Sequence, residues 1–251
     1  MEHFLSLVLA GLFAGTMNAV AGGGSFVSFP VLVLAGLPPV AANASSTVAL
    51  FPGTMASTWA YRDDLRGIAG IGLKVLLPIT LAGGLTGAIL LLVTPGGVFD
   101  AVIPWLLLLA TLTFAGGRRL GDWLRHHLRI GRGAFLVVQF ILSIYGGYFG
   151  GAVGLMMMAA WTLLDSAELK AMAAPRALLV STANGAAVVC FAVAGAVWWP
   201  ETLAMMVSAI AGGYYGARFA RLLPAAVLRW FVVLLSATVT IAFFLRTYRL
   251  V

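Results

Sequence analysis

The sequence predicts an all-α polytopic membrane protein made of two inverted-topology repeats, each with a glycine-broken opening segment followed by three transmembrane helices. Composition is the first reason: 62% of the 251 residues are hydrophobic and 9% are charged, whereas soluble domains carry about 25% charged residues. The second reason is an internal sequence repeat, and the third is the distribution of lysine and arginine among the loops.

The internal repeat is clearest in the second part of each half, where residues 80–114 recur as residues 209–243. The matching glycines are Gly83, Gly84 and Gly87 in the first copy and Gly212, Gly213 and Gly216 in the second. This divides the chain into a first transmembrane repeat (1–117), a basic cytoplasmic linker (118–133) and a second transmembrane repeat (134–251). Two weakly similar halves in a membrane chain are the usual layout of a secondary transporter.

Eight apolar segments follow one another along the chain. They cover roughly residues 4–35, 40–61, 68–93, 98–116, 134–164, 172–198, 201–217 and 226–245. The opening segment of each half is much longer than the ~20 residues that one crossing needs. Glycines interrupt both opening segments, at 22–24 and at Gly150, Gly151 and Gly154. Each is therefore predicted to be either one long tilted helix or a re-entrant hairpin of two half-helices.

The basic residues favour the re-entrant alternative. If all eight segments cross the bilayer, 10 of the 15 lysines and arginines lie on one side. If each opening segment folds back, with the N-terminus outside, 13 of the 15 lie on the inner side. Cytoplasmic loops carry the excess of Lys and Arg in membrane proteins. Each half then has three full crossings, and this odd number predicts that the second half is inverted relative to the first.

Several classes of function lack the residues they need. The net charge of +7 is explained by topology signals, so no nucleic-acid partner is expected. Cys190 is the only cysteine, and the histidines and acidic residues lie in or near loops. We therefore predict no metal site, no cofactor and no enzyme activity. Without a mid-membrane carboxylate, the sequence also offers no carrier for a coupling proton or sodium ion.

The N-terminus is a separate question. Its apolar run has no basic start, so we expect it to belong to the mature protein rather than to a cleaved signal peptide.

The glycine breaks are the first candidate binding elements. Irregular backbone within a membrane is tolerated only where protein or a water-filled cavity surrounds it. The break at Gly22, Gly23, Gly24 and Ser25 would expose N–H groups at the start of the next half-helix, a position that attracts anions. Gly151 would offer the same in the second half. The alternative is that these small residues only allow helices to pack closely.

Polar side chains near the breaks and at the starts of the following helices are the second group of candidates. They are Asn18, Asn43, Ser45, Ser46, Tyr148, Arg176 and Asn184. Arg176 would present a planar, permanently charged fork that suits a pair of anion oxygens. Two other uses compete with binding. The hydroxyl and amide groups would cap helix N-termini, or they would join neighbouring helices by hydrogen bonds.

Three runs of sequence resemble the TauE/SafE sulfite exporter family. They are GLFAGTMNAVAGGGSF and its continuation at residues 11–62, YGGYFGGAVGLMMMAAW and its continuation at 145–199, and GGYYGARFARLLP at 212–224. The resemblance covers nearly the whole chain. It implies a multi-pass transporter of small sulfur-containing anions, such as sulfite or organosulfonates, that usually moves them outward across the inner membrane.

We therefore predict a secondary transporter whose small anionic substrate binds between the two halves, near the membrane midplane. An inside-negative potential supplies about 2.3 kcal/mol per 100 mV to an outward-moving monoanion, so export would need no coupling ion. Besides the substrate and the lipid bilayer, the sequence leaves a homo-oligomeric partner open. The alternative function is a membrane-embedded scaffold or assembly protein without transport activity.

Overall fold

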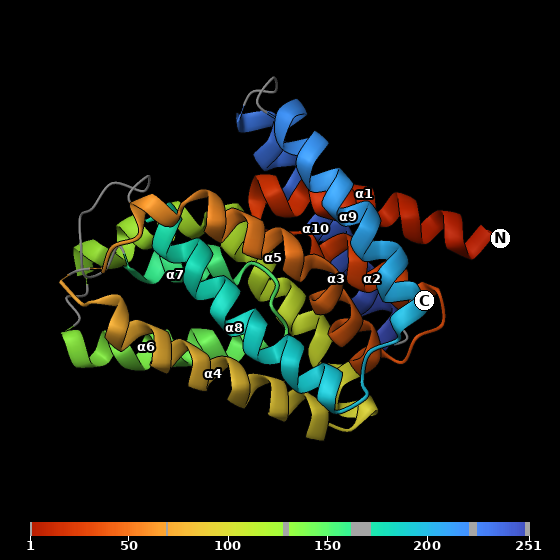
Figure 1. Ribbon diagram of the computed structural model, residues 1–251, viewed down its shortest axis with the longest axis horizontal. Coiled ribbons are helices and arrows are strands. Elements are labelled where there is room, and N and C mark those ends of the chain that lie inside the picture. The colour runs from red at the N-terminus through yellow and green to blue at the C-terminus, as the bar shows by residue number, and fades with distance from the viewer. Residues whose placement is uncertain (1, 69, 128–130, 162–171, 221–224, 249–251) are drawn as a thin grey trace.

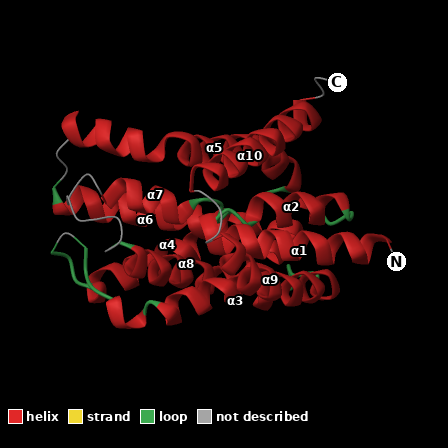
Figure 2. Ribbon diagram, turned by 90° about the horizontal axis from the view of Figure 1, so that it is seen from above, coloured by secondary structure: helices red, strands yellow, loops and turns green. Residues whose placement is uncertain are grey.

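The computed structural model describes residues 2–68, 70–127, 131–161, 172–220 and 225–248, and this part of the chain is all helical (Figure 1). Most helices lie side by side along the long axis, with α5 and α10 together along one edge in Figure 2. The helices are α1 (Glu2–Ala21), α2 (Ser25–Leu34), α3 (Pro39–Ala60), α4 (Leu73–Val93), α5 (Gly96–His127), α6 (Arg132–Tyr148), α7 (Val153–Trp161), α8 (Ala173–Val193), α9 (Trp199–Ala220) and α10 (Ala225–Tyr248), with a 3₁₀ turn, η1, at Arg62–Asp64.

Four helical stretches of the described residues are long and apolar enough to cross a bilayer. They are Leu73–Val93, Gly96–Gly116, Ala173–Val193 and Trp230–Tyr248, and shorter apolar stretches cover Phe4–Ala19 and Ser25–Leu34. Large apolar side chains such as Leu81, Leu85 and Ile89 of α4 lie exposed on the outside. Because they recur one turn apart, they form a continuous face of the kind that lipid covers. The prediction of an all-α polytopic membrane protein is confirmed at this level.

Both opening segments break where the glycines predict. α1 ends at Ala21 and α2 begins at Ser25, while α6 ends at Tyr148 and α7 begins at Val153. Gly22 and Gly150 take φ values of +71° and +79°, which glycine adopts without the steric cost that a Cβ atom imposes. Ala152 also has a positive φ, +59°, at a cost of roughly 1–2 kcal/mol for a residue with a side chain.

The chain reverses direction at each break. After Gly24, which lies against Ala14 and Asn18, Val27 packs beside Ala14, so α2 runs back along α1. In the second half, Trp161 of α7 reaches back to bond Gln139 of α6. The 20 residues of α1 span about 30 Å, the thickness of the hydrocarbon core, whereas α2 has 10. The first opening segment is therefore not one continuous helix: it is broken at the glycines into a long arm and a short arm that folds back.

Equivalent helices of the two halves pack against each other in opposite directions. On α5 and α10, the hydroxyls of Thr111 and Thr240 lie 2.9 Å apart, while Trp105 donates to the Tyr248 hydroxyl at 2.9 Å. Numbering therefore rises along one helix as it falls along the other. The other contacts also join the two halves in matching pairs: α1 of the first half packs on α9 of the second, and their equivalents, α6 of the second half and α4 of the first, pack on each other.

Small residues bring these helix pairs close together. A methyl group added to Gly212 of α9 would overlap the carbonyl oxygen of Leu12 in α1, and one added to Gly87 of α4 would overlap that of Ile144 in α6. Glycine permits this approach, which is the usual basis of helix association in membranes. The predicted linker at 118–133 begins as the last turns of α5, and residues 128–130 lie outside the described part.

Candidate functional site

A cavity of about 80 Å³ lies where the two glycine breaks face the middle of α3 and α8. One enclosed water needs about 10–15 Å³ of such volume, so the cavity has room for a small ligand. Its lining comes from both halves: Asn18, Gly22, Ser25, Thr47, Leu50, Thr54, Ser57, Gly150, Val153, Gly154, Leu155, Arg176, Ala177, Val180 and Asn184.

Repeat-equivalent positions line the cavity in pairs. Four pairs are separated by 130 residues in the sequence: Ser25 and Leu155, Thr47 and Ala177, Leu50 and Val180, and Thr54 and Asn184. Each half therefore contributes the same positions of its short arm and of the helix that follows it.

Five of the predicted site residues line this cavity: Asn18, Gly22, Ser25, Arg176 and Asn184. They come from α1, from the first break and from α8. Because these elements are far apart in sequence, only the folding of α1 and α2 beside α3 and α8 brings the side chains together.

Three predicted glycines lie outside the cavity lining and face other side chains. A methyl group on Gly23 would lie 2.9 Å from the Phe114 ring, and one on Gly151 would lie 2.7 Å from the Phe149 ring. At Gly24 it would lie 2.6 Å from the carbonyl oxygen of Ala14. These contacts agree with the alternative of close packing at these positions.

Four predicted polar residues also lie outside the lining, and three of them connect the two halves. Asn43 donates from Nδ2 to the Tyr148 carbonyl oxygen at 2.9 Å, and the Trp198 N–H donates to the Ser45 hydroxyl at 3.1 Å. Ser46 instead bonds the Ser28 hydroxyl at 2.6 Å within its own half.

The idea that these residues cap their own helix is wrong. The N-cap of α3 is Pro38, with no side-chain bond, because α3 begins four residues before Asn43. The side chains of Asn43 and Ser45 instead bond helix ends of the other half, since Tyr148 is the last residue of α6 and Trp198 precedes α9. Helix ends leave such backbone groups without partners.

Arg176 is the only charged side chain among the described residues that line the cavity. Its aliphatic stem lies along Gly154, where an added methyl group would be 3.2 Å from Cδ. Within the described part of the chain, its guanidinium has no ion pair and donates no hydrogen bond. A partly buried cation without a partner is unfavourable unless an anion or water joins it.

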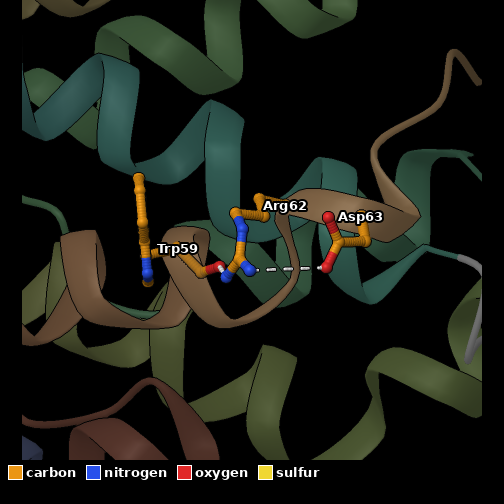
Figure 3. A network of polar contacts seen from close by, with 3 residues as sticks. All are labelled: Trp59, Arg62 and Asp63. Atoms are coloured by element: carbon orange, nitrogen blue, oxygen red, sulfur yellow. Dashed lines mark hydrogen bonds and ion pairs between the residues drawn. The ribbon is translucent and has the colours of Figure 1, made fainter.

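Arg62 shows the contrasting case (Figure 3). Its guanidinium lies 4.9 Å from the centre of the Trp59 ring, donates to the Trp59 carbonyl oxygen at 3.2 Å, and pairs with Asp63 at 3.7 Å. The Arg62 side chain is half exposed, so this pair contributes little to stability. The positive charge of Arg62 is thus balanced by Asp63 at the surface, whereas no described carboxylate balances the charge of Arg176.

Neutral groups complete the polar surface of the cavity. Asn184 holds a buried side-chain oxygen without a hydrogen-bond partner. The backbone N–H groups of Ser25, Val153 and Gly154, at the starts of α2 and α7, donate no bond within the described residues. Free N–H groups and the positive end of the helix dipole favour a negative ligand there.

Ten lining residues were not among the predicted site residues, although Gly150 and Gly154 belong to the predicted second break. The ten are Thr47, Leu50, Thr54, Ser57, Gly150, Val153, Gly154, Leu155, Ala177 and Val180. The repeat would have indicated some of them, because Thr54 is the mate of Asn184 and Leu155 is the mate of Ser25. The described residues contain no group of three or more His, Cys, Asp or Glu side chains that could hold a metal ion.

A helical membrane protein with a polar cavity between two repeats has the architecture of a secondary transporter. Residues 7–243 match the sulfite exporter TauE/SafE family. The chain belongs to this family of membrane transporters.

Its relatives carry names of the same class. A probable membrane transporter protein of Sinorhizobium, ORF9, is 31% identical over 95% of this chain and 92% of its own length. One from Haemophilus influenzae is 29% identical over 93% of this chain and 91% of its own, and YfcA of Escherichia coli K12 is 26% identical over 93% and 87%. No solved structure matches the chain.

Proposed function

We propose that the protein exports a small sulfur-containing anion, such as sulfite or an organosulfonate, across the inner membrane, and that the anion binds in the cavity beside Arg176. The observation that carries this is the guanidinium of Arg176, which has no ion pair among the described residues and belongs to a cavity between the two halves. The free N–H groups at the starts of α2 and α7 point to the same sign of ligand charge. Family membership supports the class of substrate.

The two halves are proposed to be inverted repeats. Antiparallel packing of α5 on α10 supports this. Equivalent helices α3 and α8 also pack on each other, with the Phe51 ring near Gly185. Of the basic residues, Arg62 lies in η1, Arg66 in the loop after it, and Lys74 and Arg132 in the first turns of α4 and α6. The positive-inside rule makes this end cytoplasmic.

The cavity extends toward that cytoplasmic end. Ser57 belongs to the last turns of α3, and Arg176 to the first turn of α8. Toward the other end, the bonds of Asn43 to Tyr148 and of Ser45 to Trp198 join the halves. We infer that the structure corresponds to a state open toward the cytoplasm, from which an exported anion would enter.

An aromatic cluster adds to the closure at the outer end. The Phe29 ring lies 6.5, 6.1 and 5.5 Å from the rings of Phe99, Phe149 and Phe243. These rings come from α2, from both partners of the α5 and α10 pair, and from the second break. Their contacts would have to change for the cavity to open outward.

Membrane potential is the proposed driving force. No carboxylate of the described residues lines the cavity, so the site offers no carrier for a coupling proton. An inside-negative potential favours outward movement of a monoanion by about 2.3 kcal/mol per 100 mV.

Binding of the substrate class is tested by thermal unfolding of the purified protein in detergent. Sulfite at a hundred times its Kd is expected to stabilise the folded state by about 2.7 kcal/mol, which raises the melting temperature by several degrees. Chloride at equal ionic strength serves as the control and is expected to leave the melting temperature unchanged. If no sulfur oxyanion or sulfonate stabilises the protein more than chloride does, the proposed substrate class is wrong.

A further inference from the structure

Among the described residues that line the cavity, Arg176 carries the one charge, and it is positive. Arg176 is ionised, and every other polar side chain of the lining is a neutral amide or hydroxyl: Asn18, Ser25, Thr47, Thr54, Ser57 and Asn184. A ligand that fills this cavity can therefore neutralise one positive charge. A positive group on the same ligand would find no carboxylate among these side chains.

The cavity also has two different ends along α8. Arg176 and Asn184 are eight residues apart, about 12 Å along the helix axis. The buried oxygen of Asn184 without a partner lies at the far end from the guanidinium, beside Gly150. Between them the apolar residues Leu50, Leu155 and Val180 contribute to the lining. An unsatisfied buried acceptor is costly, so the far end calls for a neutral donor such as water or a hydroxyl group.

We propose that the site selects a monoanion whose remaining part is uncharged, such as a small hydroxyalkylsulfonate, and rejects the zwitterion that carries an ammonium group in place of the hydroxyl. This rests on the proposed function. In this proposal the anionic head binds at Arg176 and the hydroxyl points along the cavity toward Asn184. An ammonium group at that position loses its hydration, finds no carboxylate among the described residues of the lining, and is repelled by the guanidinium across a medium of low dielectric constant.

A matched pair of ligands tests this selection. 2-Hydroxyethanesulfonate and 2-aminoethanesulfonate have the same chain length and the same anionic head, and differ in the hydroxyl and ammonium groups. Titration calorimetry on the purified protein is expected to give a Kd at least tenfold lower for the hydroxyl compound. Sulfite is titrated in parallel. Because sulfite has no organic chain, its binding shows whether the site accepts the anionic head alone.

A carboxylate placed in the cavity should reverse the preference. Thr54 is the repeat mate of Asn184 and lines the same cavity. Thr54→Asp is expected to improve binding of the amino compound and to weaken binding of the hydroxyl compound. Thr54→Asn has nearly the same shape without the charge, and is expected to keep the preference of the unaltered protein.

The outcomes separate this inference from the proposed function. Equal affinity for the two sulfonates, or a tighter amino compound, would overturn the selection while sulfite binding still supports the proposed function. Binding of sulfite with no binding of either sulfonate would likewise overturn it. If sulfite does not bind either, the proposed function itself fails, and the selection fails with it.

Discussion

Replacing Arg176 with glutamine is expected to abolish transport of the anion. A charge-assisted pair in a partly buried site is worth roughly 2–5 kcal/mol when one partner is removed, so substrate affinity should fall at least thirtyfold. Glutamine keeps most of the length of the arginine stem, which lies along Gly154, so the packing of α7 on α8 changes little. Sulfite flux into proteoliposomes and the melting temperature with and without sulfite are the two measurements.

The same substitution separates a binding role from a structural one. Without ligand, Arg176 is a partly buried cation with no ion pair among the described residues, so its removal should leave the melting temperature unchanged or raise it. Arg176→Lys keeps the charge but loses the planar fork, and intermediate flux is expected. Loss of ligand-free stability in Arg176→Gln, or full flux in that variant, would contradict the assignment.

Replacing Gly212 with alanine is expected to destabilise the packing of α1 on α9. The new methyl group would overlap the carbonyl oxygen of Leu12, and backbone atoms cannot move aside without separating the two helices. Overpacking of this kind costs about 1–3 kcal/mol, which lowers the melting temperature by roughly 5 °C. Thermal unfolding in detergent measures it.

The neighbouring glycine provides the control. A methyl group on Gly213 would have its nearest contact at 3.6 Å, the carbonyl oxygen of Gly15, which is an ordinary van der Waals distance. Alanine also favours the helix by about 1 kcal/mol over glycine. Gly213→Ala should therefore be neutral or stabilising. Similar losses in both variants would mean that helix separation at Leu12 is not the cause.

The helix breaks could be predicted from sequence because their cause is local. Only a residue without a Cβ readily takes the positive φ found at Gly22 and Gly150, and both stand inside apolar segments too long for one crossing. The role of the adjacent glycines could not be predicted in the same way. Whether Gly22 or Gly24 faces the cavity depends on the direction of the chain after the break, which the helical period no longer fixes.

The polar residues divide for a similar reason. Arg176 and Asn184 lie on one helix, and their spacing of two turns places them on the same face, so the sequence was sufficient to group them. Asn43 and Ser45 bond the backbone of the other half, and no local pattern indicates which helix ends come near them. Leu50 and Val180 were missed because the same apolar residue types line cavities and face lipid, so the residue type alone does not separate the two positions.

Electrogenic sulfite transport in proteoliposomes tests the central claim most directly. The protein is reconstituted with equal pH on both sides, and a potassium gradient with valinomycin sets the membrane potential. Sulfite is expected to move toward the positive side, reversing the potential should reverse the flux, and Arg176→Gln should abolish it. Flux that needs a pH gradient even at clamped potential, or that is absent under all potentials, would contradict the account.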